Sequence, residues 1–208
     1  MTQLKRYTEL PFVLQILESR RLTLLNPNSW DDLNDSHFVR TYRDRKKHGS
    51  VLALCLTGAA QTYHHWKVFT YGASGACIYF NKERLLAWIE KDKLISGREV
   101  EYKKLAQIRK TPPALDDLPF LKRKAYEHEA EFRLVYTTSR KSVALKDFDL
   151  PLDIIEAVLL NPWLPPSTVL AVADVIHRIE GCGGLEVLRA TIVKNDEWQA
   201  IAASAAVT

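Results

Sequence analysis

The spacing of apolar residues along the chain predicts an alternation of short strands and helices. Runs that are apolar throughout, or at every second position, predict strands, and apolar residues three and four apart predict helices. We expect strands over residues 5–7, 22–25, 51–56, 75–80, 98–102, 129–136, 153–160 and 185–193. We expect helices over residues 11–21, 61–70, 82–93, 118–127 and 165–179.

These elements do not repeat as strand–helix–strand units, which favours an α+β fold over a doubly wound one. We expect a single domain over residues 1–208, with a mixed, mostly antiparallel sheet flanked by helices. Its core would span residues 1–199, and the small-residue tail at 200–208 would be frayed. Residues 30–35 would form a turn rich in capping side chains, and the polar, basic stretch 40–50 would form a mobile loop.

The segment from Tyr126 to Tyr136 stands out because three glutamates and a histidine lead directly into an apolar strand. Period two along that strand would place Glu129, Glu131 and Arg133 on one face. Like charges side by side are unfavourable unless a partner or a ligand compensates them. This segment is therefore where we expect a functional site.

Composition narrows the class of protein only slightly. The chain has 208 residues, 47% of them hydrophobic, and a net charge of +4, which does not by itself imply nucleic acid. No apolar run approaches the roughly 20 residues that span a bilayer. Three cysteines without close pairing indicate a reducing cytoplasm. We expect buried thiols at Cys55 and Cys77, and an exposed one at Cys182.

Four short motifs follow one another in a defined order along the chain. They are Lys5-Arg6-Tyr7; the turn from Pro27 to Leu33; Trp66, Phe69 and Gly75; and Tyr126, Glu129, Glu131, Phe132 and Arg133. Their order and spacing resemble a widespread bacterial family catalogued as a domain of unknown function, number two-nine-seven-one. The chain departs from that family's pattern at Trp30, Asp31 and Leu33, and Phe69 replaces a tyrosine; Asp32 matches.

The order of elements is also similar to that of ADP-ribosyltransferase-type domains, which carry a Glu-x-Glu at the head of a late strand. This resemblance implies an NAD-using or NAD-cleaving enzyme, with NAD as substrate and no firmly bound cofactor. An accessory or phage-defence role would suit such families. The catalytic residues would be Glu129 and Glu131. The substrate-binding residues would be Lys5, Arg6, Tyr7, Asp32, Trp66, Phe69 and Arg133.

Other interpretations of the same residues stay open. Glu129, Glu131 and Arg133 would also suit a solvated strand face with one ion pair, and Trp66 and Phe69 would suit a core. The chain would then be a non-catalytic binding module for a protein or a nucleic acid, with phosphates held by residues 40–48 and 122–124. A metal-dependent nuclease would need Asp31, Asp32, Asn34 and Asp35 to join the glutamates around Mg²⁺. The adjacent His64 and His65 do not have metal-ligand spacing, and we expect no metal there.

Overall fold

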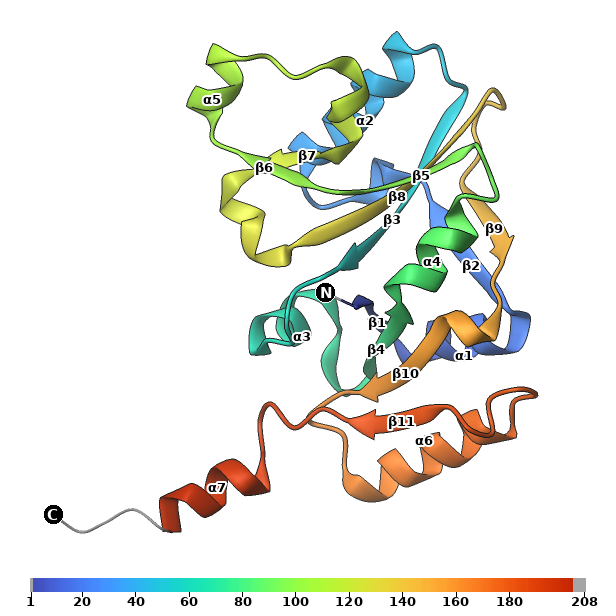
Figure 1. Cartoon of the computed structure of the whole chain (residues 1–208), viewed down its shortest axis with the longest axis vertical. Helices are drawn as coiled ribbons and strands as arrows, with labels where there is room; N and C mark the ends of the chain where they lie inside the picture. Colours follow the sequence, from blue (N-terminus) through green and yellow to red (C-terminus); the bar gives the residue numbers. More distant parts are fainter. Residues whose placement is uncertain (1, 204–208) are drawn as a thin grey trace, which may run out of the picture. The chain divides into compact units, whose positions relative to one another are not determined.

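Strands and helices mix irregularly along the chain in the computed structural model, which describes residues 2–203 (Figure 1). This arrangement confirms the α+β class. The chain forms two compact units, each assembled from three separate segments. Unit 1 comprises the described residues up to Arg6, together with Arg20–Ala59 and Phe80–Ile154. Unit 2 comprises Tyr7–Ser19, Ala60–Tyr79 and the described residues from Ile155 onward.

Unit 1 contains most of the strands, and β1 is shared with unit 2. The strands are β1 (Gln3–Glu9), β2 (Arg21–Leu25), β3 (Ser50–Thr57), β5 (Ile95–Glu99), β6 (Glu101–Lys103), β7 (Leu121–Arg123), β8 (Glu131–Thr138) and β9 (Leu145–Asp149). The α-helices are α2 (Leu33–Arg45), α4 (Lys82–Ile89) and α5 (Leu105–Lys110). Short 3-10 helices are η1 (Pro27–Ser29), η3 (Leu115–Phe120), η4 (Lys124–Glu129) and η5 (Leu152–Ile154).

Strand β8 lies between β3 and β5 and pairs antiparallel with both. Its register with β3 runs from Ser50↔Thr138 to Thr57↔Glu131. On its other edge, β3 pairs antiparallel with β1 and β2, and β2 pairs with β9. Only the small β6–β7 sheet is parallel among the strand pairs assigned within unit 1. The prediction of a mostly antiparallel sheet is therefore confirmed.

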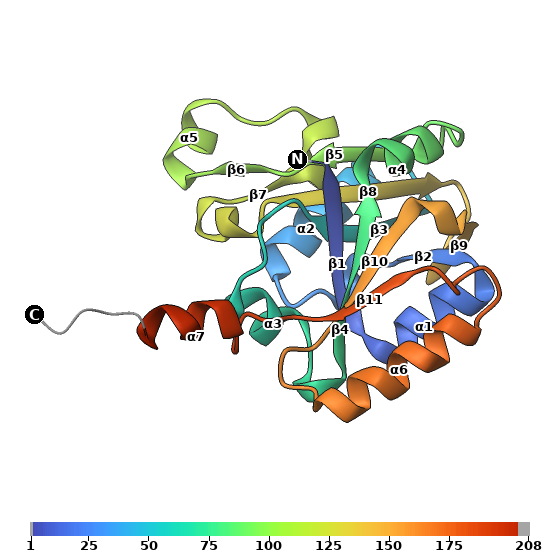
Figure 2. The same cartoon turned by 60° about the horizontal axis from the view of Figure 1, so that its bottom comes forward.

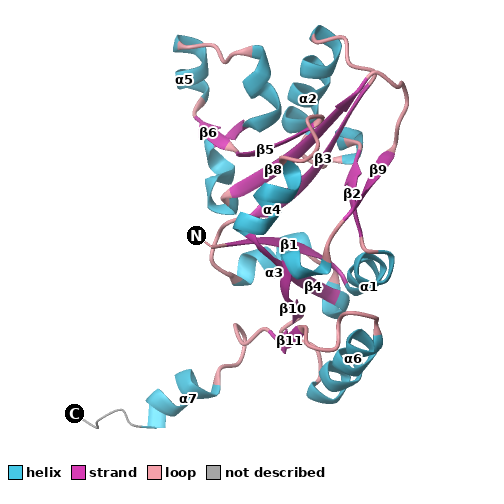
Figure 3. Ribbon diagram, turned by 45° about the vertical axis from the view of Figure 1, so that its right-hand side comes forward, coloured by secondary structure: helices cyan, strands magenta, loops and turns pink. Residues whose placement is uncertain are grey.

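Helix α2 covers one face of β3 and β8 (Figure 3). The contact buries Val39 of α2 with Ala53, Phe120 and Val135. On β5, a Cβ at Gly97 would lie 3.0–3.2 Å from side-chain atoms of β8 and α4, so the missing side chain lets these elements pack closely. Both faces of β8 are buried between residues 131 and 135, which places any polar side chain there in a nearly water-free environment.

Unit 2 is built around a shorter strand group (Figure 2). Its elements are α1 (Leu10–Ser19), α3 (Tyr63–Phe69), η2 (Gly72–Ser74), β4 (Gly75–Asn81, whose last two residues belong to unit 1), β10 (Ile155–Leu160), α6 (Pro166–Arg178), β11 (Glu186–Arg189) and α7 (Asp196–Ala203). Strands β10 and β11 are parallel. Trp66, Cys77 and Ala190 form a buried cluster on which Tyr7 and Tyr79 pack.

Several sequence predictions need correction. Residues 40–45 belong to helix α2, because Asp32 caps it and Arg43 and Arg45 suit its C-terminal end. Residues 118–127 do not form one helix, since Pro119 lies within η3 and β7 follows. The predicted frayed tail begins inside helix α7, and residues 204–208 lie outside the described residues.

The cysteines also differ from expectation. Cys55 is exposed although it lies in an apolar strand, and Cys182 is buried within its glycine-rich turn, where its N–H donates to the carbonyl of Ile179. Cys77 is buried as predicted. Among residues 2–203, no helix is long and apolar enough to cross a membrane. The prediction that the two units make up a single domain stays a prediction.

Replacing Asp32 with alanine should destabilise the protein by about 0.5–2 kcal/mol, the usual effect of losing a helix N-cap. The Asp32 carboxylate accepts from the backbone N–H groups of Asn34 at 2.9 Å and Asp35 at 3.4 Å. Urea unfolding followed by tryptophan fluorescence measures the effect. Asp31→Ala is the matched control, since Asp31 is exposed and caps nothing. Equal losses in the two variants would contradict the capping role.

Candidate functional site

The backbone around Glu129, Ala130 and Glu131 is held by hydrogen bonds on every side. The Thr57 hydroxyl donates to the Glu129 carbonyl, and the N–H of Gly58 donates to the Ala130 carbonyl at 2.9 Å. The N–H of Glu131 donates to the Tyr102 hydroxyl at 2.8 Å. These partners come from the end of β3 and from β6, which belong to two different sheets, so both sheets hold this segment in position.

Ala130 has a left-handed conformation, with φ 40° and ψ 52°, at the end of η4. Strand β8 therefore begins at Glu131, and Glu129 belongs to η4, not to the strand as predicted. The two carboxylates nevertheless converge, since both contact Nζ of Lys122, at 2.6 Å and 3.4 Å. The prediction that the two carboxylates lie on the same side is correct. The turn at Ala130 brings them there, and not the period of two along a strand.

Arg133 is fully buried and directs all of its donor groups to acceptors within unit 1. Its Nε and Nη2 donate to the two oxygens of Glu131, at 2.6 Å and 2.9 Å. Its Nη1 and Nη2 donate to the two oxygens of Asp35, at 2.8 Å and 2.7 Å, and Nη1 also donates to the carbonyl of Pro119 at 2.8 Å. The guanidinium also lies over the ring of Trp30, at 4.6 Å. Five donated bonds exhaust the five N–H groups of an arginine.

Lys122 is the second cation of the cluster. Its ammonium group contacts Glu129 and Glu131, lies 3.9 Å from Asp35, and faces the ring of Tyr126 at 4.9 Å. Three carboxylates therefore surround two cations, which leaves this group with a net charge of −1 when all are ionised. We call Asp35, Lys122, Glu129, Glu131 and Arg133 the buried charge cluster.

Electrostatics separate the two glutamates. Burial alone would raise the pKa of Glu131, but Arg133 and Lys122 outweigh burial and hold that pKa below its ordinary value. At Glu129, burial outweighs the attraction of Lys122 and raises the pKa. Burial likewise raises the pKa of Asp35 despite its bonds to Arg133. At neutral pH, Glu131 is the carboxylate that is most firmly ionised.

The interpretation of Glu129, Glu131 and Arg133 as a solvated strand face is wrong. Arg133 has no exposed surface, Glu131 is 5% exposed and Glu129 is 9% exposed. The reason is that α2, η3 and β7 cover this end of β8, and they contribute Asp35, Pro119 and Lys122 to it. Cys55, which pairs with Arg133 in the strand register, is the exposed neighbour of the cluster.

The remaining predicted site residues divide between the units. In unit 1, Nζ of Lys5 donates to the carbonyl of Ala59 at 2.8 Å. Arg6 is half-buried, and burial lowers its pKa to about 10. Asp32 caps helix α2. In unit 2, the ring of Tyr7 contacts those of Trp66 and Phe69, at centroid distances of 5.1 Å and 6.3 Å.

These three rings are unequal in exposure. Trp66 is 1% exposed and belongs to the core of unit 2, while Phe69 is 37% exposed. The Tyr7 hydroxyl is buried, and burial raises its pKa. The interpretation of Trp66 as a core residue is therefore correct, and a ligand-binding role for Tyr7 and Phe69 stays a prediction.

Sequence reasoning missed the roles of Asp35, Lys122 and Tyr102. It treated Asp35 as a turn residue or metal ligand, and Lys122 as part of a basic run. Asp35 contacts Arg133 across 98 positions of the chain, and Lys122 and Tyr102 contact Glu131 across 9 and 29 positions. No local spacing rule connects residues so placed. The one available signal was the like-charge pair itself, which requires cations nearby.

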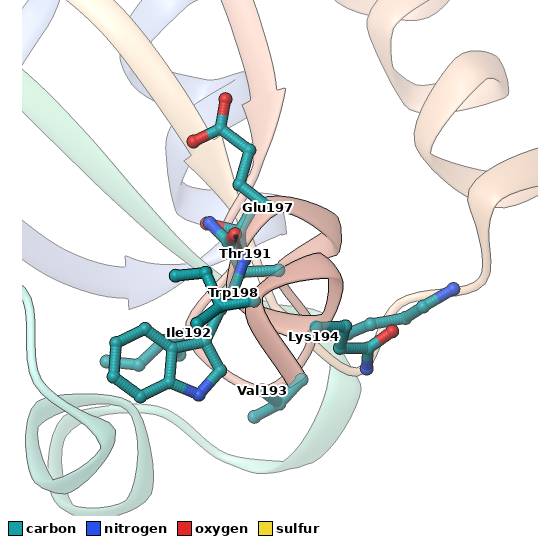
Figure 4. A pocket seen from close by; sticks show the side chains of 9 residues that line it. Thr191, Ile192, Val193, Lys194, Glu197 and Trp198 are labelled. Carbon is teal, nitrogen blue, oxygen red and sulfur yellow. Dashed lines mark hydrogen bonds between the residues drawn. The ribbon is translucent and has the colours of Figure 1, made fainter. Parts of the chain in front are cut away.

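The same contacts bear on the hypothesis of a metal-dependent nuclease. The carboxylates of Asp35, Glu129 and Glu131 are bonded to Arg133 and Lys122, and the carboxylate of Asp32 caps α2. Within the described part of the chain, no group of three or more His, Cys, Asp or Glu side chains could hold a metal ion. A hollow lined by residues 191–195, 197–199 and 201 lies around the start of α7 in unit 2, and it contains none of the predicted site residues (Figure 4).

No family model matches the sequence, and no curated protein matches it. Among solved structures, the chain is similar to that of Thermus sp. 2.9 DarT in complex with NAD+, with 11% sequence identity and a TM-score of 0.47. The match covers 91% of this chain and 95% of that chain. A likeness of this size carries no argument about fold or chemistry, and the resemblance to the bacterial family stays a prediction.

Proposed function

We propose that unit 1 cleaves the bond between nicotinamide and ribose in NAD, as an ADP-ribosyltransferase-like or NAD-cleaving enzyme. The observation that supports this most directly is the pair Glu129 and Glu131. Their carboxylates converge on one lysine while their pKa values shift in opposite directions. Pairs of acids whose environments separate their pKa values are typical of acid–base sites.

In the proposed reaction, the bond between C1′ of the ribose and the nicotinamide nitrogen breaks. The electron pair of that bond leaves with nicotinamide, and positive charge develops on the ribose, as in glycoside cleavage. Glu131 would stabilise this charge, because a carboxylate held ionised and desolvated interacts strongly with a developing cation. Its bonds to Arg133 and its backbone contact with Tyr102 fix its orientation before substrate arrives.

Glu129 would take the proton of the water or hydroxyl nucleophile that attacks C1′. Its Oε2 accepts from Lys122, while its Oε1 accepts no hydrogen bond from the described residues. A raised pKa brings a carboxyl closer to neutral pH, where proton transfer is most effective. The two glutamates thus have different roles in the proposal, one electrostatic and one proton-accepting.

Charge for the diphosphate would come from Arg6, not from Arg133. Every N–H group of Arg133 already donates to an acceptor within unit 1, so we assign the phosphate contact to Arg6 instead. Arg6 is half-buried and has no acidic partner in the described part of unit 1. Lys5, next to it on β1, already donates to a backbone carbonyl and would contribute less.

The pH dependence of NAD turnover tests the role of Glu129. Only the ionised carboxylate accepts a proton, so the rate should rise with pH through the raised pKa of Glu129 and then level off. Glu129→Gln should lower turnover by about 10²- to 10⁴-fold, the usual contribution of a general base. In this variant, NAD turnover should also no longer rise with pH. Nicotinamide release from NAD, followed by chromatography, measures both.

Glu127→Gln is the matched control, because Glu127 lies on the same short helix but pairs with exposed Lys124. It should leave turnover unchanged. If the purified chain releases no nicotinamide at any pH, with or without added protein or nucleic acid acceptors, the proposed function is wrong.

A non-catalytic binding module is the second candidate, and one observation favours it. All donors of Arg133 and both oxygens of Glu131 are already bonded within unit 1, as expected of a structural brace between α2, η3 and β8. In that case, substitutions in the buried charge cluster would change stability alone, and no NAD would be consumed.

A further inference from the structure

The end of helix α2 and the turn between β8 and β9 together form a strongly basic surface of unit 1. Residues 40–48 and 139–142 contain seven arginines and lysines and a single acidic residue, Asp44. We call these cations the α2 basic surface; they are Arg40, Arg43, Arg45, Lys46, Lys47, Arg140 and Lys141. Neither segment takes part in the proposed NAD chemistry.

Gly49, which directly follows the first segment, contacts the start of the second, although about ninety positions separate them in sequence. The N–H of Gly49 donates to the carbonyl of Thr138 at 2.8 Å. A Cβ at Gly49 would lie 2.2 Å from the carbonyl oxygen of Ser139 and 2.5 Å from that of Arg140, so only glycine permits this approach. The approach brings the turn between β8 and β9 close to the segment that follows α2; both segments lie in the upper part of Figure 1.

Little negative charge offsets these cations. Arg43 pairs with Asp44 at 2.8 Å, and Lys46 pairs with Asp116 of η3 at 2.6 Å. Arg40, Arg45, Lys47, Arg140 and Lys141 are exposed and make no ion pair with a described acidic side chain. Seven cations against these two acids leave a net charge of +5, which exceeds the +4 of the whole chain.

We propose that the α2 basic surface binds duplex nucleic acid through its phosphate groups. A group of exposed cations without acidic partners is complementary to the phosphate backbone of a duplex. An anionic membrane fits less well, because interfacial binding also needs apolar side chains to insert. The two segments present none, since their only aromatic side chains, Tyr42 and His48, are half-buried.

The same two rings favour a duplex over a single strand. Single-stranded nucleic acid is typically bound by stacking its bases on exposed aromatic rings. Tyr42 packs on the core cluster around Val39, and its ring contacts that of His48 at 5.4 Å. Both rings are therefore occupied within the protein. Contacts to phosphates alone suit a duplex, whose bases are already stacked inside.

The backbone at Lys47 gives this surface a sharper test. Lys47 has φ 59°, and the N–H groups of Lys47 and His48 donate to the carbonyls of Asp44 and Arg43. This is the Schellman arrangement, in which glycine is strongly favoured at the left-handed position. Lysine occupies it here at a cost in stability. Lys47→Gly should therefore raise the melting temperature while it weakens nucleic acid binding.

The experiment measures fluorescence anisotropy of a labelled, mixed-sequence 20-base-pair DNA duplex with the full chain at several salt concentrations. We expect the logarithm of the affinity to fall linearly with the logarithm of the salt concentration, by roughly 0.9 for each phosphate contacted. The triple variant Arg45→Glu, Lys47→Glu and Arg140→Glu should reduce that slope by about 3 and lower the affinity by at least about 10-fold. Lys47→Gly alone should bind more weakly and melt at a higher temperature.

The matched control reverses three equally exposed cations on and beside α5, Lys104, Arg109 and Lys110, and should leave binding unchanged. Equal losses in the two triple variants would overturn the proposal. So would unchanged binding in Lys47→Gly, tighter binding of a single strand than of the duplex, or equal affinity for anionic phospholipid vesicles. None of these outcomes depends on NAD turnover.

Discussion

Replacing Arg133 with methionine is expected to lower the free energy of unfolding by about 3–5 kcal/mol, the usual effect of removing one partner of a buried ion pair. Methionine keeps much of the volume but leaves Asp35 and Glu131 without the four bonds that Arg133 gives them. Two buried carboxylates would then share Lys122 as their remaining cation. Urea unfolding measures the change.

Arg98→Met is the matched control, because Arg98 sits directly opposite Arg133 in the β5–β8 register. Its side chain is 50% exposed and pairs with Asp117 at 2.9 Å, so its loss should cost only about 0–1 kcal/mol. A triple variant, Arg133→Met with Asp35→Leu and Glu131→Met, should recover much of the lost stability, since apolar packing often replaces a buried ion pair without loss. A small effect of Arg133→Met alone would contradict the proposed bracing.

The same cluster determines how stability responds to acid. The pKa of Glu131 is lower in the folded protein than its ordinary value, so its contribution is fully present above that ordinary pKa. The contribution is lost as the pH falls through the lowered pKa. The raised pKa values of Asp35 and Glu129 act in the opposite sense, because their protonated forms are favoured by folding. Arg133→Met, which removes the main cause of the Glu131 shift, should make unfolding less sensitive to acid in this range.

Replacing Glu131 with glutamine should lower NAD turnover by about 10²- to 10³-fold, which is typical of losing one preorganised electrostatic contact to a transition state. The amide keeps an oxygen that can accept from Nε of Arg133, but it carries no charge to stabilise the ribose cation. Nicotinamide release under saturating NAD measures the effect on the chemical step.

Asp35→Asn is the control that distinguishes a catalytic role of Glu131 from a structural role of the cluster. It removes one negative charge from the same cluster and the same arginine, but in the proposal Asp35 does not contact substrate. We expect a stability change with turnover kept within a few fold. A Glu131→Gln variant with full activity would sink the proposed mechanism, and equal losses in the two variants would favour the structural brace.

The sequence predicted β3 and β8 well, because apolar runs and apolar alternation reflect burial on a sheet. It placed β5 at residues 98–102, although this strand spans Ile95–Glu99. It failed for residues 40–45, where the side chains are mostly polar and basic and Tyr42 is the residue that packs against the apolar core. It also failed at Ala130, since alanine rarely adopts the left-handed conformation and its presence does not predict one. The turn at Ala130 moves Glu129 off the strand, so the site's location was predictable and its internal geometry was not.

The partners of the two glutamates could not be predicted from the sequence, for a different reason. Asp35 and Lys122 lie on elements that neighbour β8 only after the sheet has formed. A rule based on local spacing describes contacts within one helix or strand, while this cluster joins α2, β7, η4 and β8. Charge balance was the available constraint, and it indicated that cations were needed without identifying them.

The division of the chain between the units affects how the protein can be dissected genetically. Each unit draws on three stretches of sequence, and the backbone passes from one unit to the other five times. No truncation from either terminus can therefore deliver unit 1 alone, because its segments enclose residues 7–19 and 60–79 of unit 2. A shortened gene that ends after Ile154 would keep the buried charge cluster but leave Trp66 and Cys77 without Ala190. Deletion mapping would then report loss of activity for cuts far from the chemistry, so point substitutions are the sounder route to function.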